Sequence, residues 1–381
     1  MFEQFVSFVQ QLYAATPGEF VPLHVPRFRG NEKKYLLDCI DSTFVSSVGE
    51  YVNRFEQLMA EITGTKYAIA VVNGTNALHV ALRIAGVKQN DLVISQPLSF
   101  IATCNAIRYQ GAEPLFVDVD SETLGLSPVK LQEFLEHEAY VNEKGESIHK
   151  TSGQRIAACV PMHTFGHSAK IEEIVTVCQK YHIPVIEDAA ESLGSYYKDK
   201  HTGTFGRAGV ISFNGNKTVT SGGGGAILTN DADFAHKAKH LTTQAKQPHA
   251  WEYVHDEIGY NYRMPNLNAA LACAQLEQLP VFLQSKRKIA KDYAHFFESY
   301  EQTFIAEPVN SESNFWLNTV LMKNLEERDA FLQYTNSHGV MTRPAWKLMH
   351  QLPMFLNCIR GDLTIAESLA SRLVNIPSSV I

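Results

Sequence analysis

The sequence predicts an α/β protein with a mostly parallel central sheet sandwiched by helices, followed by a smaller C-terminal α+β domain. From Tyr67 onward, short apolar runs alternate with helical patterns, which is typical of a parallel sheet covered by helices. Beyond Trp251 this alternation gives way to one long helical region. At roughly 100–200 residues per domain, the 381 residues accommodate about two lobes.

The elements follow from the apolar spacing. Residues 1–15 have apolar positions near helical spacing, carry Glu3 and lack a basic start, so they predict an amphipathic surface helix and not a signal peptide. Strand-like and helix-like runs then alternate over 67–72, 76–86, 92–98, 100–111, 113–120, 155–162, 171–181 and 183–190. The polar stretch 136–154 predicts a surface excursion. The runs 209–214 and 224–230 are too close for a helical crossover, so they are antiparallel or not adjacent.

These runs suggest a domain organisation. We expect an N-terminal helix and arm over residues 1–30, a large domain over 31–250 and a small α+β domain over 251–381. Within the small domain, the pattern predicts a long helical region over 266–300 interrupted at Pro280, short strands near 314–322 and a helix near 326–339.

Composition excludes several classes of protein. The 33 Lys and Arg residues against 40 Asp and Glu residues give a net charge of −7, whereas nucleic-acid binding needs a basic footprint. The six cysteines are scattered without metal-site spacing, so neither a disulfide framework nor a metal site is expected. No apolar run reaches the roughly 18 residues of a membrane span. Together these features predict a cytoplasmic protein with no membrane partner.

Chemistry-bearing residues follow the predicted strands, where open α/β sheets place their ligands. The turn 73–76 (NGTN) stands between a strand and a helix, so its N–H groups could hold a phosphate, although a plain N-cap is the commoner role. Asp188 closes an apolar run, where a carboxylate is costly unless it caps a helix or meets a cation. Lys217 follows the next strand, and a solvated loop lysine is the alternative. Phe100 either covers a flat ligand or fills the core.

The combination is more informative than its parts. Pyridoxal phosphate needs a helix start for its phosphate, an acid for its pyridine nitrogen and a lysine amine for its aldehyde. The turn 73–76, Asp188 and Lys217 supply that set. The residues therefore predict a pyridoxal-phosphate site.

Seven stretches in order resemble the DegT/DnrJ/EryC1/StrS sugar aminotransferases, which are fold type I pyridoxal-phosphate enzymes. They are FVSSVGEYVNRFE (44–56), VNGTNALHVAL (72–82), PLSFIATCNAI (97–107), EDAAESLGS (187–195), SFNGNKTVTSGGGG (212–225), GYNYRMPNLNAAL (259–271) and TRPAWKLMH (342–350). The resemblance runs from about His24 to the C-terminus. It is closest to the legionaminic-acid-pathway type of nucleotide-sugar 4-aminotransferase.

The resemblance implies roles around the cofactor ring. It makes Lys217 the lysine that carries the cofactor as a Schiff base, Asp188 the partner of the pyridine nitrogen and Phe100 the residue that stacks on the ring. Glu191 occupies a place where many relatives have glutamine near the cofactor's phenolic oxygen. A carboxylate repels a phenolate unless one of them holds a proton, so the role of Glu191 stays open.

The resemblance also implies the phosphate site and the partner subunit. Gly74, Thr75 and Ser212 would hold the phosphate. Asn261 and Arg263 match a segment that reaches the neighbouring subunit's active site in relatives, which implies a homodimer with shared active sites.

Four further side chains are candidates for substrate binding. His163 and His167 follow a strand and could line the site, with packed or surface histidines as the alternative. Trp346 and His350 could help to hold a nucleotide sugar, although packing is the commoner role of such residues.

The expected function is transfer of an amino group from L-glutamate to the C4 ketone of a nucleotide-linked 4-keto-6-deoxy sugar. UDP-4-keto-6-deoxy-N-acetylhexosamine is the expected substrate, for surface-polysaccharide or nonulosonic acid biosynthesis. A sugar dehydratase of the same family is one rival, but one dehydratase type replaces the lysine by histidine, and Lys217 argues against it. A non-catalytic sensor of the cofactor or the sugar nucleotide is another rival, although no fused DNA-binding module is visible. An oxidoreductase would need GxGxxG where this chain has NGTNAL.

Overall fold

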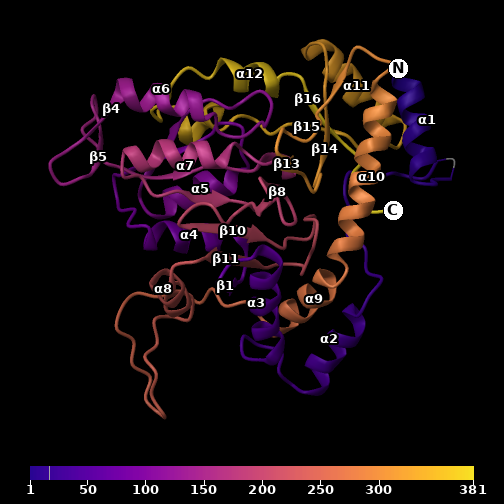
Figure 1. Cartoon of the computed structure of the whole chain (residues 1–381). Helices are drawn as coiled ribbons and strands as arrows, with labels where there is room; N and C mark the ends of the chain where they lie inside the picture. Colours follow the sequence, from indigo (N-terminus) through magenta and orange to yellow (C-terminus); the bar gives the residue numbers. More distant parts are fainter. Residues whose placement is uncertain (17) are drawn as a thin grey trace.

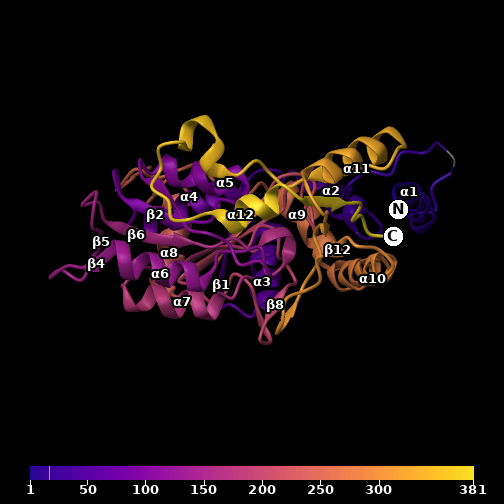
Figure 2. The same cartoon turned by 90° about the horizontal axis from the view of Figure 1, so that it is seen from above.

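The computed structural model describes residues 1–16 and 18–381. A large α/β domain lies beside a smaller domain that holds both ends of the chain (Figures 1 and 2). Among the residues described, no helix is both long enough and apolar enough to cross a membrane.

The large domain is built on a sheet with the strand order β3-β2-β6-β7-β10-β11-β1. The strands are β1 (Tyr67–Val71), β2 (Leu92–Ser95), β3 (Glu113–Phe116), β6 (Ile156–Val160), β7 (Ile186–Asp188), β10 (Ala208–Ser212) and β11 (Gly225–Thr229). Parallel bridges from Cys159 to Val185 and from Met162 to Asp188 join β6 to β7. Only β11 runs antiparallel to its neighbours, β1 and β10. The predicted, mostly parallel sheet is confirmed, and the close runs 209–214 and 224–230 contain an antiparallel pair of neighbours.

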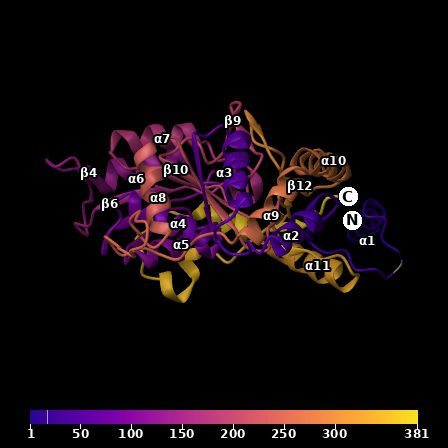
Figure 3. The same cartoon turned by 90° about the horizontal axis from the view of Figure 1, so that it is seen from below.

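Helices cover both faces of this sheet because the strands present apolar side chains on both sides. In β1, Ile69 and Val71 pack into the core under α4 (Gly74–Ile84), whereas Ala68 and Ala70 pack into the core under α3 (Glu50–Thr63). The first face carries α4 (Gly74–Ile84), α5 (Ile101–Tyr109) and α8 (Ala232–Thr242). The second carries α3 (Glu50–Thr63), α6 (Pro128–Glu138), α7 (Ile171–Lys180) and α9 (Asn266–Leu276), with α2 (Glu32–Asp41) beside α9. Figure 3 shows α4 and α5 opposite α6 and α7.

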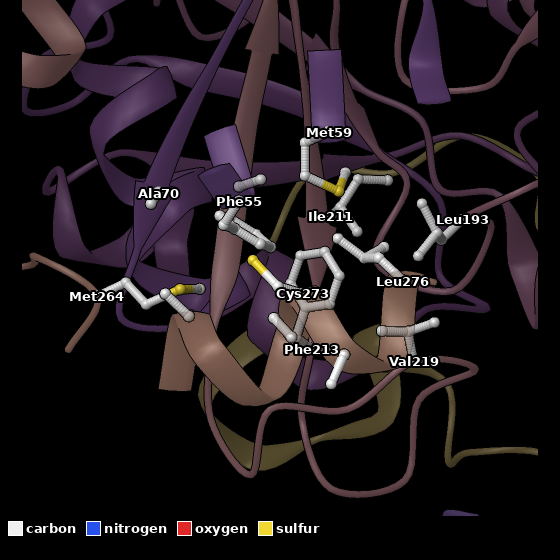
Figure 4. Packing of buried hydrophobic residues seen from close by; sticks show 14 of the residues in the cluster. Phe55, Met59, Ala70, Leu193, Ile211, Phe213, Val219, Met264, Cys273 and Leu276 are labelled. Carbon is white, nitrogen blue, oxygen red and sulfur yellow. The ribbon is translucent and has the colours of Figure 1, made fainter. Parts of the chain in front are cut away.

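The core beneath α3 and α9 is formed by side chains that lie far apart in the sequence. Phe55 and Met59 from α3 meet Phe213, which follows β10, and Cys273 and Leu276 from α9 (Figure 4). The rings of Phe55 and Phe213 pack edge to face with 5.1 Å between their centroids. This packing fixes the chain immediately after β10, where Lys217 is located.

Short strands form small sheets outside the central sheet. The predicted surface excursion contains the hairpin β4 (Ala139–Val141) and β5 (Ser147–His149). The strands β8 (Tyr196–Tyr197), β9 (Lys200–His201) and β13 (Ser311–Glu312) form a small sheet that links the two domains.

The small domain has an antiparallel sheet in the order β12-β14-β16-β15. Its strands are β12 (Thr303–Phe304), β14 (Asn318–Leu321), β15 (Arg343–Pro344) and β16 (Leu373–Ile376). Its helices are α1 (Phe2–Leu12), α10 (Leu279–Phe297), α11 (Leu325–Ser337) and α12 (Thr364–Ala370), with the 3-10 turns η2 (Met349–Gln351) and η3 (Pro353–Phe355). The expected helical region splits before Pro280, which occupies the first turn of α10, where proline is tolerated.

The domain boundaries near residues 30 and 250 stay a prediction. In the structure, α1 buries Phe5 and Val9 against the helices of the small domain. Helix α9 instead packs in the core of the large domain.

Candidate active site

A cavity of about 380 Å³ lies where β7 and β10 end and where α4 and α5 begin. This volume is typical of small-molecule sites. The carboxyl ends of neighbouring parallel strands meet at one edge of a sheet, which explains why residues from distant parts of the chain converge here. The predicted site residues that line the cavity are Gly74, Thr75, Phe100, Asp188, Glu191, Ser212, Lys217 and Trp346.

The first turn of α4 forms an anion cradle at one end of the cavity. Asn73 is the N-cap, and its Oδ1 accepts a hydrogen bond from the N–H of Asn76 at 2.8 Å. The earlier N–H groups of a helix have no intrahelical acceptor, so those of Gly74 and Thr75 are available to a ligand. A Cβ on Gly74 would lie 3.0 Å from the Cβ of Ser212, and this close approach brings the Ser212 hydroxyl to the same cradle.

The four consecutive glycines at 222–225 bring the chain close to the same turn. A Cβ on Gly225 would lie 2.6 Å from the carbonyl carbon of Asn73, so only glycine lets β11 begin against this turn.

Asp188 presents a buried carboxylate to the cavity. Its Oδ2 accepts a hydrogen bond from the Thr103 hydroxyl at 2.6 Å, and its Oδ1 accepts one from the N–H of Ala190 at 3.2 Å. Burial raises the pKa of Asp188, while these two hydrogen bonds and the nearby Lys217 lower it. A cation at the cavity face would therefore stabilise the ionised carboxylate.

Lys217 lies between a carboxylate and an aromatic ring. Its Nζ is 3.2 Å from Glu191 Oε1 and 4.0 Å from the ring centroid of Trp316. The second carboxylate oxygen of Glu191 accepts a hydrogen bond from the N–H of Phe165 at 2.9 Å. Burial raises the pKa of Glu191 to about 7, although Lys217 acts in the opposite direction. The lysine amine is thus held in place and points into the cavity.

Aromatic rings form the outer part of the cavity. Phe100 is the N-cap of α5 and is 46% exposed, and its ring lies 6.0 Å from that of Trp346. Trp346 in turn packs 4.8 Å from the ring of Phe165. This arrangement leaves the Phe100 ring free to cover a flat ligand.

The three candidate histidines do not line this cavity. The Nε2 of His163 lies 3.0 Å from Glu187 Oε2, and its Nδ1 accepts the N–H of Ala169, so both ring nitrogens have protein partners. His167 is fully buried beside Ser313, and burial lowers its pKa to about 4. His350 Nε2 lies 3.1 Å from Glu367. A substrate role for these histidines stays a prediction.

Asn261 and Arg263 also lie outside the cavity. The Arg263 guanidinium donates to Asn261 Oδ1 at 3.3 Å, and the backbones of Arg263 and Val71 form an isolated bridge. Both residues lie between α8 and α9, near the end of the long segment 243–265 that extends from the large domain (Figure 1). Their role in a neighbouring subunit stays a prediction.

Sequence reasoning missed Thr103, whose hydroxyl donates to Asp188, and Trp316, which lines the cavity. Thr103 stands one helical turn beyond Phe100, so the helical spacing of 100–107 could have identified it. Trp316 comes from the small domain, and no local signal links it to Lys217.

The residues present fit pyridoxal phosphate. The Gly74–Thr75 turn with Ser212 suits a phosphate, Phe100 suits the ring face, Asp188 suits a protonated pyridine nitrogen and Lys217 suits an aldehyde. Among the residues that the structure describes, no cationic side chain lies within ion-pair distance of Asp188, and a protonated pyridine nitrogen would supply that cation.

Comparison with known proteins identifies the family of the chain. The family model of the DegT/DnrJ/EryC1/StrS aminotransferases matches residues 26–380. The chain is 39% identical over 361 residues to EpsN of Bacillus subtilis (strain 168), covering 93% of this chain and 90% of that protein. It is 38% identical over 360 residues to GDP-perosamine synthase of Escherichia coli O157:H7, covering 94% and 93% of the two chains.

Solved structures share the fold. PseC of Helicobacter pylori, an aminotransferase involved in pseudoaminic acid biosynthesis, superposes with a TM-score of 0.85 over 94% of each chain at 23% identity. The family match, the relatives and the cavity lead to one conclusion: the chain belongs to the DegT/DnrJ/EryC1/StrS aminotransferase family and is a pyridoxal-phosphate-dependent aminotransferase.

Proposed function

We propose that this enzyme transfers the amino group of L-glutamate to the C4 ketone of a nucleotide-linked 4-keto-6-deoxy sugar. The first candidate substrate is UDP-4-keto-6-deoxy-N-acetylhexosamine, on a route to surface polysaccharide or to a nonulosonic acid such as legionaminic acid. A GDP-linked sugar is the second candidate, because the relative that is 38% identical is a GDP-perosamine synthase. A cytoplasmic location stays part of the proposal.

One observation carries the proposal: a single cavity brings together Lys217, Asp188 and the Gly74–Thr75 turn beneath the aromatic rings of the small domain. Bound pyridoxal phosphate supplies an electron sink for bonds made and broken at an amino-bearing carbon. Trp346 and Trp316 line the same cavity and would offer an apolar wall to the sugar.

Each residue contributes a defined step. Lys217 Nζ would hold the cofactor through its aldehyde and, as a free amine, would move the proton at the α-carbon of glutamate. Asp188 keeps the pyridine nitrogen protonated, and the Thr103 hydroxyl orients that carboxylate. The N–H groups of Gly74 and Thr75 hold the phosphate.

Incubation with glutamate and a panel of UDP-, GDP- and dTDP-linked 4-keto-6-deoxy sugars tests this function. We expect release of 2-oxoglutarate matched by an amino sugar in the mass spectrum, with the UDP-linked N-acetylhexosamine turned over fastest and the Lys217→Ala protein as the negative control. Turnover of GDP-linked sugars alone would favour the second candidate. Loss of water without gain of nitrogen would identify a dehydratase, and no reaction with the whole panel would exclude this substrate class.

We further propose a homodimer with shared active sites. Apolar side chains are exposed on α2 and the loop after it, namely Leu37, Ile40, Phe44, Val45 and Val48, and on the long loop before α9, namely Trp251, Tyr253 and Ile258. A second cavity, of about 590 Å³, opens beside the first of these surfaces and is lined by Asp38, Arg54 and Asn266 among others. Exposed apolar clusters of this kind mark interfaces, and a second copy of the chain would cover them.

Subunit mixing tests the shared site. Lys217→Ala and Arg263→Ala are each expected to be inactive, yet a hybrid dimer places both defects in one site and leaves the other site intact. Random mixing should then restore about a quarter of wild-type activity at most, given twofold symmetry and independent sites. Absence of recovery despite proven subunit exchange would put Arg263 outside the partner's site.

A further inference from the structure

Trp316 forms the wall of the cavity against Lys217, and it belongs to the 314–317 segment of the small domain. Trp316 lies over the lysine amine, and its indole N–H donates to the carbonyl of Asn216 at 2.7 Å, next to Lys217 in the chain. Asn314 donates from Nδ2 to the carbonyl oxygen of Glu191 at 2.9 Å. The segment therefore contacts both members of the Lys217–Glu191 pair.

This segment has a strained backbone. Phe315 adopts a φ of 48°, in the left-handed region that bulky residues avoid. The N–H of Trp316 donates to Asn314 Oδ1 at 2.8 Å, which closes a tight turn around Phe315. Such a conformation persists only where the surrounding structure holds it.

Lys286 binds the backbone of the 314–317 segment. It projects from α10, is fully buried and donates from Nζ to the carbonyls of Phe315 and Trp316, both at 3.2 Å, and of Ser378 at 2.7 Å. Burial lowers the pKa of Lys286 to about 7, because the charged amine loses its hydration. Three carbonyl oxygens match the three N–H donors of an ammonium, and each offsets part of that loss.

We propose that Lys286 is a positioning residue for Lys217, acting through Trp316. By tying the carbonyls of Phe315 and Trp316 to Ser378 in the C-terminal tail, it keeps the indole against the reactive amine. The tail is itself held in place, since Ser378 Oγ accepts a hydrogen bond from the N–H of Asn318 at 2.7 Å. Ser378 thus supports the active site although it does not line the cavity.

The inference rests on the role proposed for Lys217 and is independent of the sugar. A misplaced amine meets the cofactor aldehyde in the wrong geometry, and small displacements of reacting groups slow bond formation strongly. The loss should therefore appear when the cofactor-free protein takes up pyridoxal phosphate, before any substrate is present.

The test measures the rate at which cofactor-free protein forms its covalent bond with added pyridoxal phosphate, followed by absorbance. Lys286→Met keeps the length of the side chain and removes the donors. We expect it to slow bond formation roughly 10- to 100-fold. Trp316→Phe should slow it similarly, and adding Lys286→Met to Trp316→Phe should slow it little further, since Lys286 is proposed to act only by holding the indole that Trp316→Phe already removes.

Tyr293→Phe is the matched control. Tyr293 is also fully buried on α10, and its hydroxyl donates to the carbonyl of Pro377 at 2.9 Å, one residue before Ser378. Its removal should lower the thermal unfolding midpoint and leave the uptake rate at the wild-type value. An equal slowing by Tyr293→Phe, or full additivity of Lys286→Met with Trp316→Phe, would overturn the proposal.

The remaining outcomes are also decisive. A folded Lys286→Met protein with a wild-type uptake rate contradicts the positioning role. If Lys286→Met does not fold, Trp316→Phe decides alone, and a wild-type rate for that variant rules out positioning through the indole. A wild-type protein that forms no bond at Lys217 would instead reject the role proposed for Lys217 itself.

Discussion

Replacement of Lys217 by alanine is expected to lower amino transfer by about 10⁴-fold or more, because this one amine is proposed to supply both the covalent attachment and the proton transfer. The wild-type protein should be yellow when loaded with pyridoxal phosphate, and borohydride reduction followed by mass spectrometry should locate the cofactor on the peptide that contains Lys217. The variant should lose the colour and the modified peptide together.

The loss of Lys217 must be separated from an effect on folding. The alanine variant leaves Glu191 without its cationic partner in a buried site, where an unpaired charge is costly. Burial already raises the pKa of Glu191 to about 7, so this carboxyl can take up a proton. A Lys217→Ala/Glu191→Gln double variant has no unpaired carboxylate at position 191. It should therefore fold normally and still be inactive. Wild-type transamination by Lys217→Ala would refute the assignment.

Replacement of Asp188 by asparagine is expected to lower kcat by about 10²- to 10³-fold, the usual loss when a charge-stabilising group is removed from an active site. An amide cannot keep the pyridine nitrogen protonated, so the electron sink fails while the phosphate contacts of Gly74 and Thr75 persist. The cofactor should therefore remain bound, as absorbance after gel filtration will show. Asp188→Glu should cost far less, because it keeps the charge.

A variant of Thr103, which contacts Asp188, controls for this interpretation. The Thr103 hydroxyl donates to Asp188 Oδ2, and this hydrogen bond lowers the pKa of the carboxyl. Thr103→Val removes that hydroxyl. The Thr103→Val variant should have a lower kcat than the wild type, but the loss should be smaller than that of Asp188→Asn. Thr103→Ser should restore the activity. Equal activity of the wild type and Asp188→Asn would contradict the role of Asp188 as the acid beside the pyridine nitrogen.

Much of the fold could be predicted from local patterns. The alternation of apolar strands and amphipathic helices is a property of short segments, and it indicated the mostly parallel sheet. The spacing between the runs 209–214 and 224–230 left no room for a crossover helix, which allowed an antiparallel pair, and the structure contains that pair as β10 and β11. Strand order could not be predicted, because it depends on contacts between segments far apart in the chain.

Part of the site was also visible locally. Asp188 and Lys217 end or follow strands of one sheet, and parallel strands deliver their carboxyl ends to one edge, so their proximity follows from topology. The same argument brought in the 73–76 turn, whose unpaired N–H groups are a property of any helix start. His163 and His167 follow strands too, yet their rings have protein partners away from the cavity.

Local patterns were sufficient to predict the fold class, the 73–76 turn proposed for the phosphate and the residue types that pyridoxal phosphate requires, since each is encoded within a few consecutive residues. Folding of the whole chain was needed to place Trp316 over Lys217, Glu191 beside the same amine and Lys286 at the carbonyls of the 314–317 segment. These contacts join residues separated by 26 to about 100 positions. Each distance depends on how segments far apart in the chain pack together, and no local periodicity records that packing.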